Sequence, residues 1–504
     1  MPAVPDSKVF PLDHLALRGD RDAPALVLRN ATLNHEALNA RVGLLAGWLQ
    51  SRVGEAGGRV ATWLPKTELA CLMPLAAVRA GLVHVPVNPL LKRAQVAHIL
   101  GDSGAALLIS NKARLDSLEA GDVACPMIDE PSAWNQAESL GSVLPPSDAL
   151  PDSLAAILYT SGSTGRPKGV MLSQANLWLG AVSVAHYLKL TPDDRVLAVL
   201  PLAFDYGQNQ LLSTWYAGGA VVPLDYLTPR DVMKAVERFG ITTIAAVPPL
   251  WLQLTELDWP ADVAGQLRRL TNSGGALTES LVRGLRAKFP AADLYPMYGL
   301  TEAFRSTYLD PALVDAHPTS IGGAIPFAEI LVVNDAGELA GPDEEGELVH
   351  TGPLVAQGYW QDAARTVERF RAAPAFSATG GTAVWSGDRV RRDRQGLLHF
   401  VGRRDAMIKT SGNRVSPQEV EEAAIATGLV AEAVALGLPD AQLGQAIHLV
   451  ARAVAGSDRD ELIPALTRAL PNFMVPRHVH WREEIPVSPN GKLDRVALAK
   501  EFEA

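Results

Sequence analysis

Apolar residues follow two alternating spacings along the first half of the chain. In one segment they recur every three or four residues, as in a helix with one buried face: Leu38, Val42, Leu45 and Leu49. Continuous apolar runs at 24–28 and 59–63 flank that segment and are typical of buried strands. A second helix is expected at 68–80, followed by a strand at 83–87. This alternation predicts parallel β/α layering.

The alternation returns after a break. Glycine, serine and proline cluster at 141–147, with Pro151 close behind, and this composition predicts a connector between two β/α blocks. A helix is expected later, at 231–239. The strands expected around it lie at 195–199, 220–223 and 242–247.

The pattern changes in the last third of the chain. From about Ile325, short apolar pieces between glycine-rich turns predict a smaller β-rich subdomain, with strands at 330–334 and 346–350. From about Asp405, a separate α+β unit is expected, with helices and strands at 417–427, 433–437, 446–454 and 459–470. We therefore expect an α/β protein with a large N-terminal domain at 1–404 and a small C-terminal domain at 405–504.

Composition and charge narrow the possible functions. The 504 residues are 48% hydrophobic, enough for a sizeable core, and the net charge of −10 disfavours a nucleic-acid partner. The two cysteines, Cys71 and Cys125, provide no disulfide framework and suit a reducing compartment. No export signal is visible, and no apolar run reaches the ~20 residues that a membrane span needs. These observations predict a soluble, cytoplasmic protein.

The most informative segment is 158–172, which reads LYTSGSTGRPKGVML and follows an apolar run. Hydroxyl side chains alternate in it with glycines before a lysine, through Thr160, Ser161, Gly162, Ser163, Thr164, Gly165 and Lys168. Small residues let backbone N–H groups approach an anion, and the hydroxyls and the ammonium add donors and charge. A flexible surface turn is the alternative, but it would not need so many donors after a buried strand. The segment therefore predicts a phosphate-binding loop, although it lacks the Walker A pattern.

This segment resembles the phosphate-binding loop of the AMP-forming adenylating superfamily, which includes acyl-CoA synthetases, aminoacyl-adenylating domains and luciferases. Further motifs of that superfamily are matched in order at 298–302, 386–388, 402–405, 408–414 and 489–495. The resemblance covers nearly the whole chain. Residues 201–211 and 298–308 also look like the AMP-forming acyl-CoA ligases associated with bacterial exosortase gene clusters, a name that denotes a genomic association.

The resemblance implies nucleotide-binding roles for scattered residues. Those expected around the adenine are Gly274, Gly275, Ala276, Tyr298 and Gly299. Asp388 would accept hydrogen bonds from the ribose hydroxyls, Thr301 would contact the α-phosphate and Glu302 would hold Mg²⁺. Without the ordered motifs, Asp388 would be an ordinary turn aspartate and Glu302 a solvated carboxylate.

The same resemblance implies a mobile C-terminal domain. Lys492 follows a Pro-Asn-Gly turn and would bridge the substrate carboxylate and the phosphate oxygens. Arg403 would lie beside the nucleotide, and Asp405 would be the hinge about which the turn at 410–413 replaces the lysine loop. A rigid salt bridge between domains is the alternative for Asp405.

By resemblance, the acid is surrounded by Phe204, Asp205, Asn209, Ser273, Met297 and Arg305. Phe-Asp is common in amino-acid-activating domains, where the aspartate accepts the α-ammonium, and a buried aspartate needs a cationic partner. Arg305 could neutralise Asp205 and leave the pocket to a plain acyl chain. It could also bind a polar end of the substrate while Asp205 takes an amine. The sequence leaves both alternatives open.

The predicted function is an ATP-dependent acid–thiol ligase with Mg²⁺ as cofactor. A carboxylate and ATP would give an acyl-adenylate and pyrophosphate, and a thiol would displace AMP to give a thioester. The thiol is coenzyme A or the phosphopantetheine of an acyl carrier protein, and no residue separates the two. The alternatives are an amino-acid-activating ligase that loads a carrier protein, an oxidative enzyme of luciferase type, and a non-catalytic nucleotide-binding scaffold.

Overall fold

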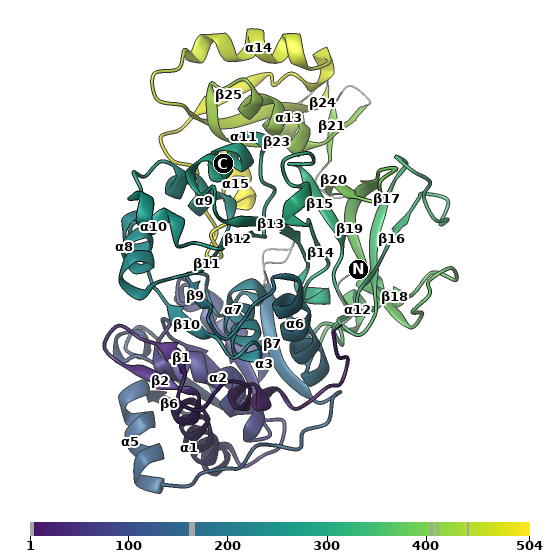
Figure 1. Ribbon diagram of the computed structural model, residues 1–504. Coiled ribbons are helices and arrows are strands. Elements are labelled where there is room, and N and C mark those ends of the chain that lie inside the picture. Colours follow the sequence, from purple (N-terminus) through teal and green to yellow (C-terminus); the bar gives the residue numbers. More distant parts are fainter. Residues whose placement is uncertain (1–4, 161–166, 404–406, 411–412, 441–442, 504) are drawn as a thin grey trace.

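The computed structural model describes residues 5–160, 167–403, 407–410, 413–440 and 443–503 (Figure 1). The predictions for Ser161, Gly162, Ser163, Thr164, Gly165 and Asp405 lie outside these residues. The chain passes from two adjoining β/α layers to a β-rich region and then to a smaller C-terminal unit.

The first sheet is built mainly from the first β/α block. Its strands lie in the order β6 (Met127–Asp129), β5 (Leu107–Ser110), β3 (Arg59–Trp63), β4 (Val83–Pro86), β7 (Leu154–Thr160) and β8 (Lys168–Ser173). The pairs from β6 to β7 are parallel, whereas β7 and β8 are antiparallel. The helices of this block are α1 (His35–Val53), α2 (Glu68–Arg79), α3 (Arg93–Ser103), α4 (Lys112–Leu115) and α5 (Glu130–Leu140).

Local signals explain the ends of the two helices that the sequence predicts here. Asn34 caps α1 by accepting a hydrogen bond from the Ala37 amide, and Gly54 ends it in the left-handed region at φ 68°. The Thr67 side chain caps α2 in the same way. Pro74 lies inside α2, where burial on all sides compensates for the missing backbone donor.

The segment at 141–147 does not separate two sheets, contrary to its expected role as a connector between blocks. β7 follows it in the chain but pairs with β4 of the first block. The segment instead packs along α1, since the Leu144 amide donates to the Gly43 carbonyl at 3.0 Å. Ser147 donates to the buried carboxylate of Asp13 at 2.6 Å. Its composition indicates a loop, but strand pairing depends on long-range contacts.

The second sheet is larger and changes character along its width. Its strands lie in the order β16 (Glu329–Val333), β17 (Glu345–Thr351), β19 (Thr382–Arg392), β20 (Leu398–Arg403), β15 (Ser320–Ala324), β14 (Thr307–Tyr308), β13 (Asp293–Tyr298), β12 (Arg269–Asn272), β11 (Thr243–Ala246), β9 (Arg195–Ala198), β10 (Ala220–Pro223), β1 (Pro24–Val27) and β2 (Thr32–Asn34), with β18 (Phe370–Ala372) on β19. The strands from β13 to β1 pair in parallel, and those from β13 to β16 pair antiparallel. The expected β-rich subdomain is therefore continuous with the β/α layer.

The helical elements of this region lie before or between its strands in the chain. They are η1 (Leu12–Leu17), α6 (Gln174–Tyr187), α7 (Asp205–Tyr216), α8 (Pro229–Phe239), α9 (Pro248–Thr255), α10 (Ala261–Gly265), α11 (Glu279–Lys288), η2 (Thr301–Ala303), η3 (Pro311–Leu313) and α12 (Ala363–Arg369). The loops after β9, β11, β12 and β13 leave the same edge of the sheet, because these strands are parallel. Ligand sites in parallel sheets lie at such an edge.

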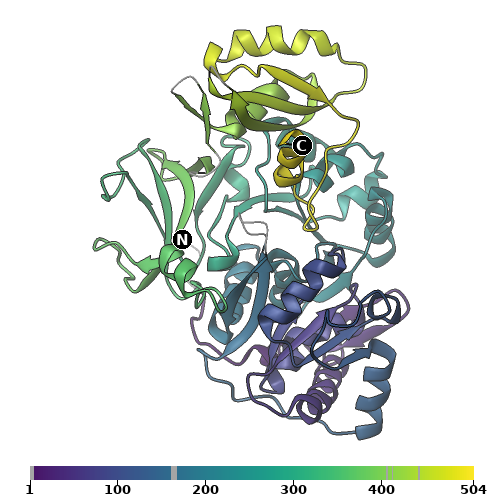
Figure 2. The ribbon, with the colours of Figure 1, turned by 180° about the vertical axis from the view of Figure 1, so that it is seen from behind.

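The C-terminal unit has its own sheet and apolar clusters. Its strands lie in the order β22 (Asn413–Val415), β21 (Ile408–Thr410), β24 (Gly444–Ala453) and β23 (Val430–Asp440), with β25 (His478–Trp481) on β24. Its helical elements are α13 (Pro417–Ala426), η4 (Arg459–Glu461), α14 (Leu462–Ala469), η5 (Asn472–Met474) and α15 (Arg495–Glu503). The helix expected at 459–470 is thus divided into η4 and α14. In Figure 2, the yellow loop before α15 reaches from this unit toward the teal part of the chain.

The α/β class and the large and small parts expected from the sequence are confirmed. Among the described residues, no helix combines the length and the apolar character that a membrane span requires.

Candidate active site

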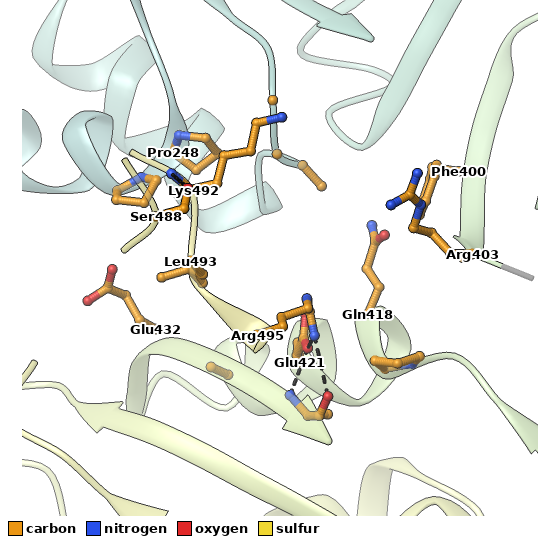
Figure 3. Close-up of a pocket in the computed structure, with 18 of the residues that line it drawn as sticks. Pro248, Phe400, Arg403, Gln418, Glu421, Glu432, Ser488, Lys492, Leu493 and Arg495 are labelled. Atoms are coloured by element: carbon orange, nitrogen blue, oxygen red, sulfur yellow. Dashed lines mark hydrogen bonds and ion pairs between the residues drawn. The ribbon is translucent and has the colours of Figure 1, made fainter. Parts of the chain in front are cut away.

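A cleft of about 2080 Å³ lies between the C-terminal unit and the sheet edge described above. Figure 3 shows Lys492 and Arg403 projecting into it from opposite sides. The predicted site residues that line it are Thr160, Lys168, Phe204, Asp205, Ser273, Gly274, Gly275, Ala276, Met297, Tyr298, Gly299, Thr301, Glu302, Arg305, Asp388, Arg403 and Lys492. Asn209 lies on a small buried cavity beside the cleft. The structure therefore brings together residues more than 300 positions apart in the sequence.

At one end of the cleft, Lys168 and Glu302 form an ion pair with an Nζ to Oε1 distance of 3.1 Å. Tyr359 joins them: its hydroxyl accepts from Lys168 and donates to Glu302, both at 2.7 Å. Burial would raise the pKa of the Glu302 carboxyl, but the Lys168 charge and the Tyr359 hydrogen bond hold it below its ordinary value. Glu302 is therefore ionised at neutral pH.

A second set of paired side chains lies nearby. Asp388 on β19 is directly opposite Arg403 on β20 in the strand register, and the Arg403 Nε donates to Asp388 Oδ1 at 2.9 Å. The Tyr298 hydroxyl donates to Asp388 Oδ2 at 2.5 Å. Burial and the Asp388 charge raise the pKa of Tyr298 well above its ordinary value. We call this set, with Lys168, Glu302 and Tyr359, the nucleotide end of the cleft.

Lys492 enters the cleft on a tight loop. The Gly491 amide donates to the Ser488 carbonyl at 2.8 Å, with Gly491 in the left-handed region at φ 78°. Asn88 holds the loop from the other side, because its Nδ2 donates to the Pro489 carbonyl and to Asn490 Oδ1, both at 3.0 Å. The loop belongs to the C-terminal unit, and Asn88 holds it against the N-terminal part of the molecule.

The Lys492 side chain crosses Gly274 and reaches Phe204. A Cβ added at Gly274, which has φ 83°, would lie 2.7 Å from Lys492 Cε. The Lys492 Nζ lies 4.8 Å from the centre of the Phe204 ring. Burial lowers the pKa of the Lys492 ammonium, a tendency that the Asp205 charge opposes and the Arg403 charge strengthens. No ion pair to this ammonium is formed within the described residues.

Asp205 and Arg305 pair beneath Lys492. Asp205 begins α7, and its Oδ2 lies 3.5 Å from an Arg305 Nη1. Its Oδ1 accepts a hydrogen bond from Thr301 at 3.2 Å. The two charged side chains are 4% and 2% exposed, so the pair is withdrawn from solvent. We call Phe204, Asp205, Arg305 and Lys492 the acid end of the cleft.

Tyr359 and Arg369 were not among the predicted site residues. Tyr359 is brought to Lys168 by an isolated antiparallel bridge to Val170. Arg369 lines the cleft, and its positive charge acts on Glu302 and Tyr359. The only local signal was a tyrosine after Gly358, which occupies the left-handed region at φ 124°.

A further ion pair joins Arg495, which follows the lysine loop, to Glu421 on α13. Both terminal nitrogens of Arg495 contact the Glu421 carboxylate at 2.5 Å, and Glu421 also accepts from the Ala435 amide. Glu421 and Arg495 lie close together in Figure 3.

Among the described residues, no group of three His, Cys, Asp or Glu side chains is arranged to hold a metal ion. A single carboxylate such as Glu302 is nevertheless compatible with Mg²⁺, which commonly binds one or two protein carboxylates together with phosphate oxygens and water.

A family model described as AMP-binding enzyme matches residues 14–360, and one described as AMP-binding enzyme C-terminal domain matches 419–492. The chain belongs to the AMP-binding enzyme family. The first match includes Lys168, Tyr298, Glu302 and Tyr359, and the second ends at Lys492, whereas Asp388 and Arg403 lie between the two matched ranges. The predictions of the superfamily and of an AMP-forming ligase are confirmed.

The relatives differ in what their names say they act on. The chain is 31% identical to the L-proline--[L-prolyl-carrier protein] ligase of Pseudomonas fluorescens, covering 95% of this chain and 96% of that protein. It is 30% identical to the feruloyl-CoA synthase of an Amycolatopsis species, covering 93% and 94%. It also matches 13% of the length of tyrocidine synthase 2 of Brevibacillus parabrevis, at 31% identity over 94% of this chain.

Among solved structures, ATP-bound MatB from Rhodopseudomonas palustris is similar over 98% of this chain and 99% of that chain. The TM-score is 0.87 and the sequence identity is 25%. At this coverage the similarity extends over both the N-terminal part and the C-terminal unit.

Proposed function

We propose that the protein is an AMP-forming acid–thiol ligase in which ATP binds at the nucleotide end of the cleft and a carboxylic acid binds at the acid end. The observation that carries the proposal is the position of Lys492. Its ammonium lies in one cleft with Glu302, Asp388 and Phe204, and it is the cation best placed to act between the two ends. One positive charge can then serve the acid carboxylate and the α-phosphate together.

In the first step, a carboxylate oxygen of the acid forms a bond to the α-phosphorus, and the bond to the β-phosphate oxygen breaks. Pyrophosphate leaves, and an acyl-adenylate remains. Both reactants are anions, so positive charge and hydrogen-bond donors must stabilise the transition state. Lys492 supplies charge at the reacting atoms, and Thr301 is a hydroxyl donor beside them.

The nucleotide is held by groups that already have partners. Asp388 accepts from the ribose hydroxyls, and Tyr298 packs beside the adenine with Gly274, Gly275, Ala276 and Gly299. Thr160 and Lys168, which line the cleft, bind the outer phosphates. Glu302 is the carboxylate that would hold Mg²⁺, and the ion would supply positive charge next to the phosphate oxygens.

In the second step, a thiol attacks the acyl carbon and AMP leaves. The lysine loop lines the cleft, and one cleft does not hold the pyrophosphate and the incoming thiol together, so we propose that the C-terminal domain turns before this step. We place the boundary of that domain at 404/405, with Arg403 beside the nucleotide and Asp405 as the hinge.

The thiol acceptor is coenzyme A or a carrier-protein phosphopantetheine. One relative is named for a carrier-protein product and another for a coenzyme A product, so both acceptors fit the family. An amino acid remains a candidate substrate because Asp205 follows Phe204. A cytoplasmic location fits the two free cysteines, Cys71 and Cys125.

ATP–pyrophosphate exchange across a panel of aliphatic, aryl and amino acids tests the first step. We expect acid-dependent exchange, followed by AMP release and thioester formation when coenzyme A or a phosphopantetheinyl carrier protein is added. Bound ATP without exchange for any acid would instead identify a nucleotide-binding scaffold. Exchange without thioester formation for either thiol would point to a luciferase-type enzyme.

A further inference from the structure

Arg305 is the charged side chain whose surroundings say most about the acid. Its side chain is 2% exposed, and it lines both the cleft and the small buried cavity beside it. Its guanidinium stacks over the Tyr206 ring at 4.4 Å and contacts Asp205 at 3.5 Å. A guanidinium in such a position must be neutralised and hydrogen-bonded.

The pairing with Asp205 disfavours a substrate that carries an ammonium. Asp205 already accepts from Thr301 and faces the Arg305 charge, so the pair is neutral. An ammonium would place two buried cations on one carboxylate, and the repulsion between them would cost affinity. The acid end therefore suits a substrate tail without charge.

The Arg305–Asp205 contact leaves hydrogen-bonding capacity unused. Within the described residues, Arg305 Nε and Nη2 have no acceptor, although both are buried. Two buried oxygens, Asn209 Oδ1 and Gln210 Oε1, have no donor within the same residues. Asn209, Gln210 and Arg305 line the same small cavity, whose volume is about 20 Å³.

A cavity of that volume matches one oxygen-sized group. A hydroxyl accepts a hydrogen bond and donates one, so it can serve a guanidinium donor and an amide oxygen together. A carbonyl can only accept, and an ammonium can only donate. Arg305 and Met297 line both spaces, so the far end of an acid in the cleft lies next to this polar group of side chains.

We propose that the acid activated by this enzyme has an uncharged apolar body and a distal hydroxyl that accepts from Arg305 and donates to one of the two amide oxygens beside it. Arg305 is then a specificity-determining residue, with Asp205 as its counter-charge. The proposal rests on the acid–thiol ligase function proposed above, and it selects among acids for that function.

The test is ATP–pyrophosphate exchange with matched acids that differ only at the far end. One set is hexanoate, 6-hydroxyhexanoate and 6-aminohexanoate. The other is 3-phenylpropionate with its 4-hydroxy and 4-aminomethyl derivatives. Both sets are extended to acids with shorter and longer skeletons. We expect the hydroxy acid of at least one skeleton to exceed the unsubstituted acid about tenfold or more in kcat/KM, with the ammonium form lowest. Phenylalanine is compared with 3-phenylpropionate to test recognition of an α-ammonium.

The variant R305M removes the guanidinium with little change in volume. It should bring the ratio of hydroxy to plain acid close to one. Because R305M leaves Asp205 buried without its partner, the double variant D205N/R305M, which removes both charges, is measured beside it, with thermal unfolding to check folding. R283M, which changes an exposed arginine on α11, is the matched control and should keep the ratio of the unaltered protein.

The outcomes separate the two proposals. A tenfold hydroxyl preference that disappears in R305M or in the double variant supports the inference. A preference that survives both variants, or a plain or ammonium acid that equals the hydroxy acid in every skeleton, overturns it while the ligase function stands. Failure of every acid to support exchange while ATP binds overturns the ligase function and this inference with it.

Discussion

At the nucleotide end of the cleft, opposite charges face each other in the folded chain: Lys168 meets Glu302, and Arg403 meets Asp388. At the acid end, within the described residues, the Lys492 ammonium has no ion pair, and Arg305 has one ion pair, the 3.5 Å contact to Asp205. At the nucleotide end, the charged side chains thus pair with one another in the absence of ATP. At the acid end, hydrogen-bond donors remain that an acid can use.

The difference follows from what each end binds. Every adenylating enzyme must bind the same nucleotide, and mutual pairing holds the binding groups in place at little cost until the ligand replaces the partners. The acid varies between enzymes, so its recognition depends on polar groups left for the substrate. Variants of the two ends should therefore fail in different ways.

The largest effect is expected for Lys492→Ala, which removes the cation that we propose to act at the reacting atoms. Adenylate formation should fall about 1000-fold, because charge stabilisation in the transition state is lost. Thioester formation from a supplied acyl-adenylate should stay within several-fold, since we propose that the lysine loop acts only in the first step. Pyrophosphate exchange and single-turnover thioester assays measure the two.

Lys112→Ala, which changes a lysine that is 83% exposed, is the control and should leave both steps unchanged. Equal loss of both steps in Lys492→Ala would contradict the assignment of this loop to adenylation alone.

A smaller effect, about 100-fold, is expected for Glu302→Gln at the nucleotide end. The substitution removes the carboxylate that we propose to hold Mg²⁺, and it leaves Lys168 without its ionic partner. The loss should be expressed partly as a higher Mg²⁺ requirement, measured by pyrophosphate exchange across a Mg²⁺ titration. Glu338→Gln, on an exposed turn, serves as the control. An unchanged Mg²⁺ dependence would remove Glu302 from the metal site.

At high pH, the rate of adenylation should fall about tenfold, and the fall should come from Lys492 at the acid end. Burial lowers the pKa of Lys492, so its ammonium form is lost as pH rises through a value below the ordinary 10.5. Adenylation should therefore decline on the alkaline side, and Lys492→Arg should flatten that decline because a guanidinium stays charged. Pyrophosphate exchange from pH 7 to pH 10.5 tests this.

On the acidic side of the pH profile, the relevant group is the Glu302 carboxyl, whose charged form is lost as pH falls. Lys168 and Tyr359 hold the pKa of Glu302 below its ordinary value, so its ionic contribution is present above that value and is lost only as pH falls through the lowered pKa. On the alkaline side, if adenylation by Lys492→Arg declined with pH as it does in the unaltered protein, the decline would come from a group other than Lys492.

The smallest effect, about threefold, is expected for Asn88→Ala. The variant loses the two hydrogen bonds that hold the lysine loop, while Gly491 and the turn remain. Adenylation should slow, and the thioester step should be unaffected or slightly faster. Gln395→Ala, on an exposed turn, is the control. A slower thioester step in Asn88→Ala would mean that Asn88 acts elsewhere.

Local patterns in the sequence predicted the helices at 68–80 and 417–427 within one residue of α2 and α13. Helices and strands have a buried face that repeats at a fixed spacing, so neighbouring residues are enough to identify them. Glycines with a required left-handed backbone, such as Gly491, mark turns for the same local reason. The candidate site residues came from motifs that matched a known superfamily.

Only the tertiary structure decided which distant residues meet. Tyr359 reaches Lys168 through a bridge between segments about 190 positions apart, and the glycine before Tyr359 does not indicate which residue it meets. Asp205 and Arg305 allowed two arrangements on sequence grounds, and the fold pairs them at 3.5 Å. The connector at 141–147 likewise leads back into the first sheet. Strand pairing and side-chain contacts depend on the free energy of the whole packed chain, which no short segment contains.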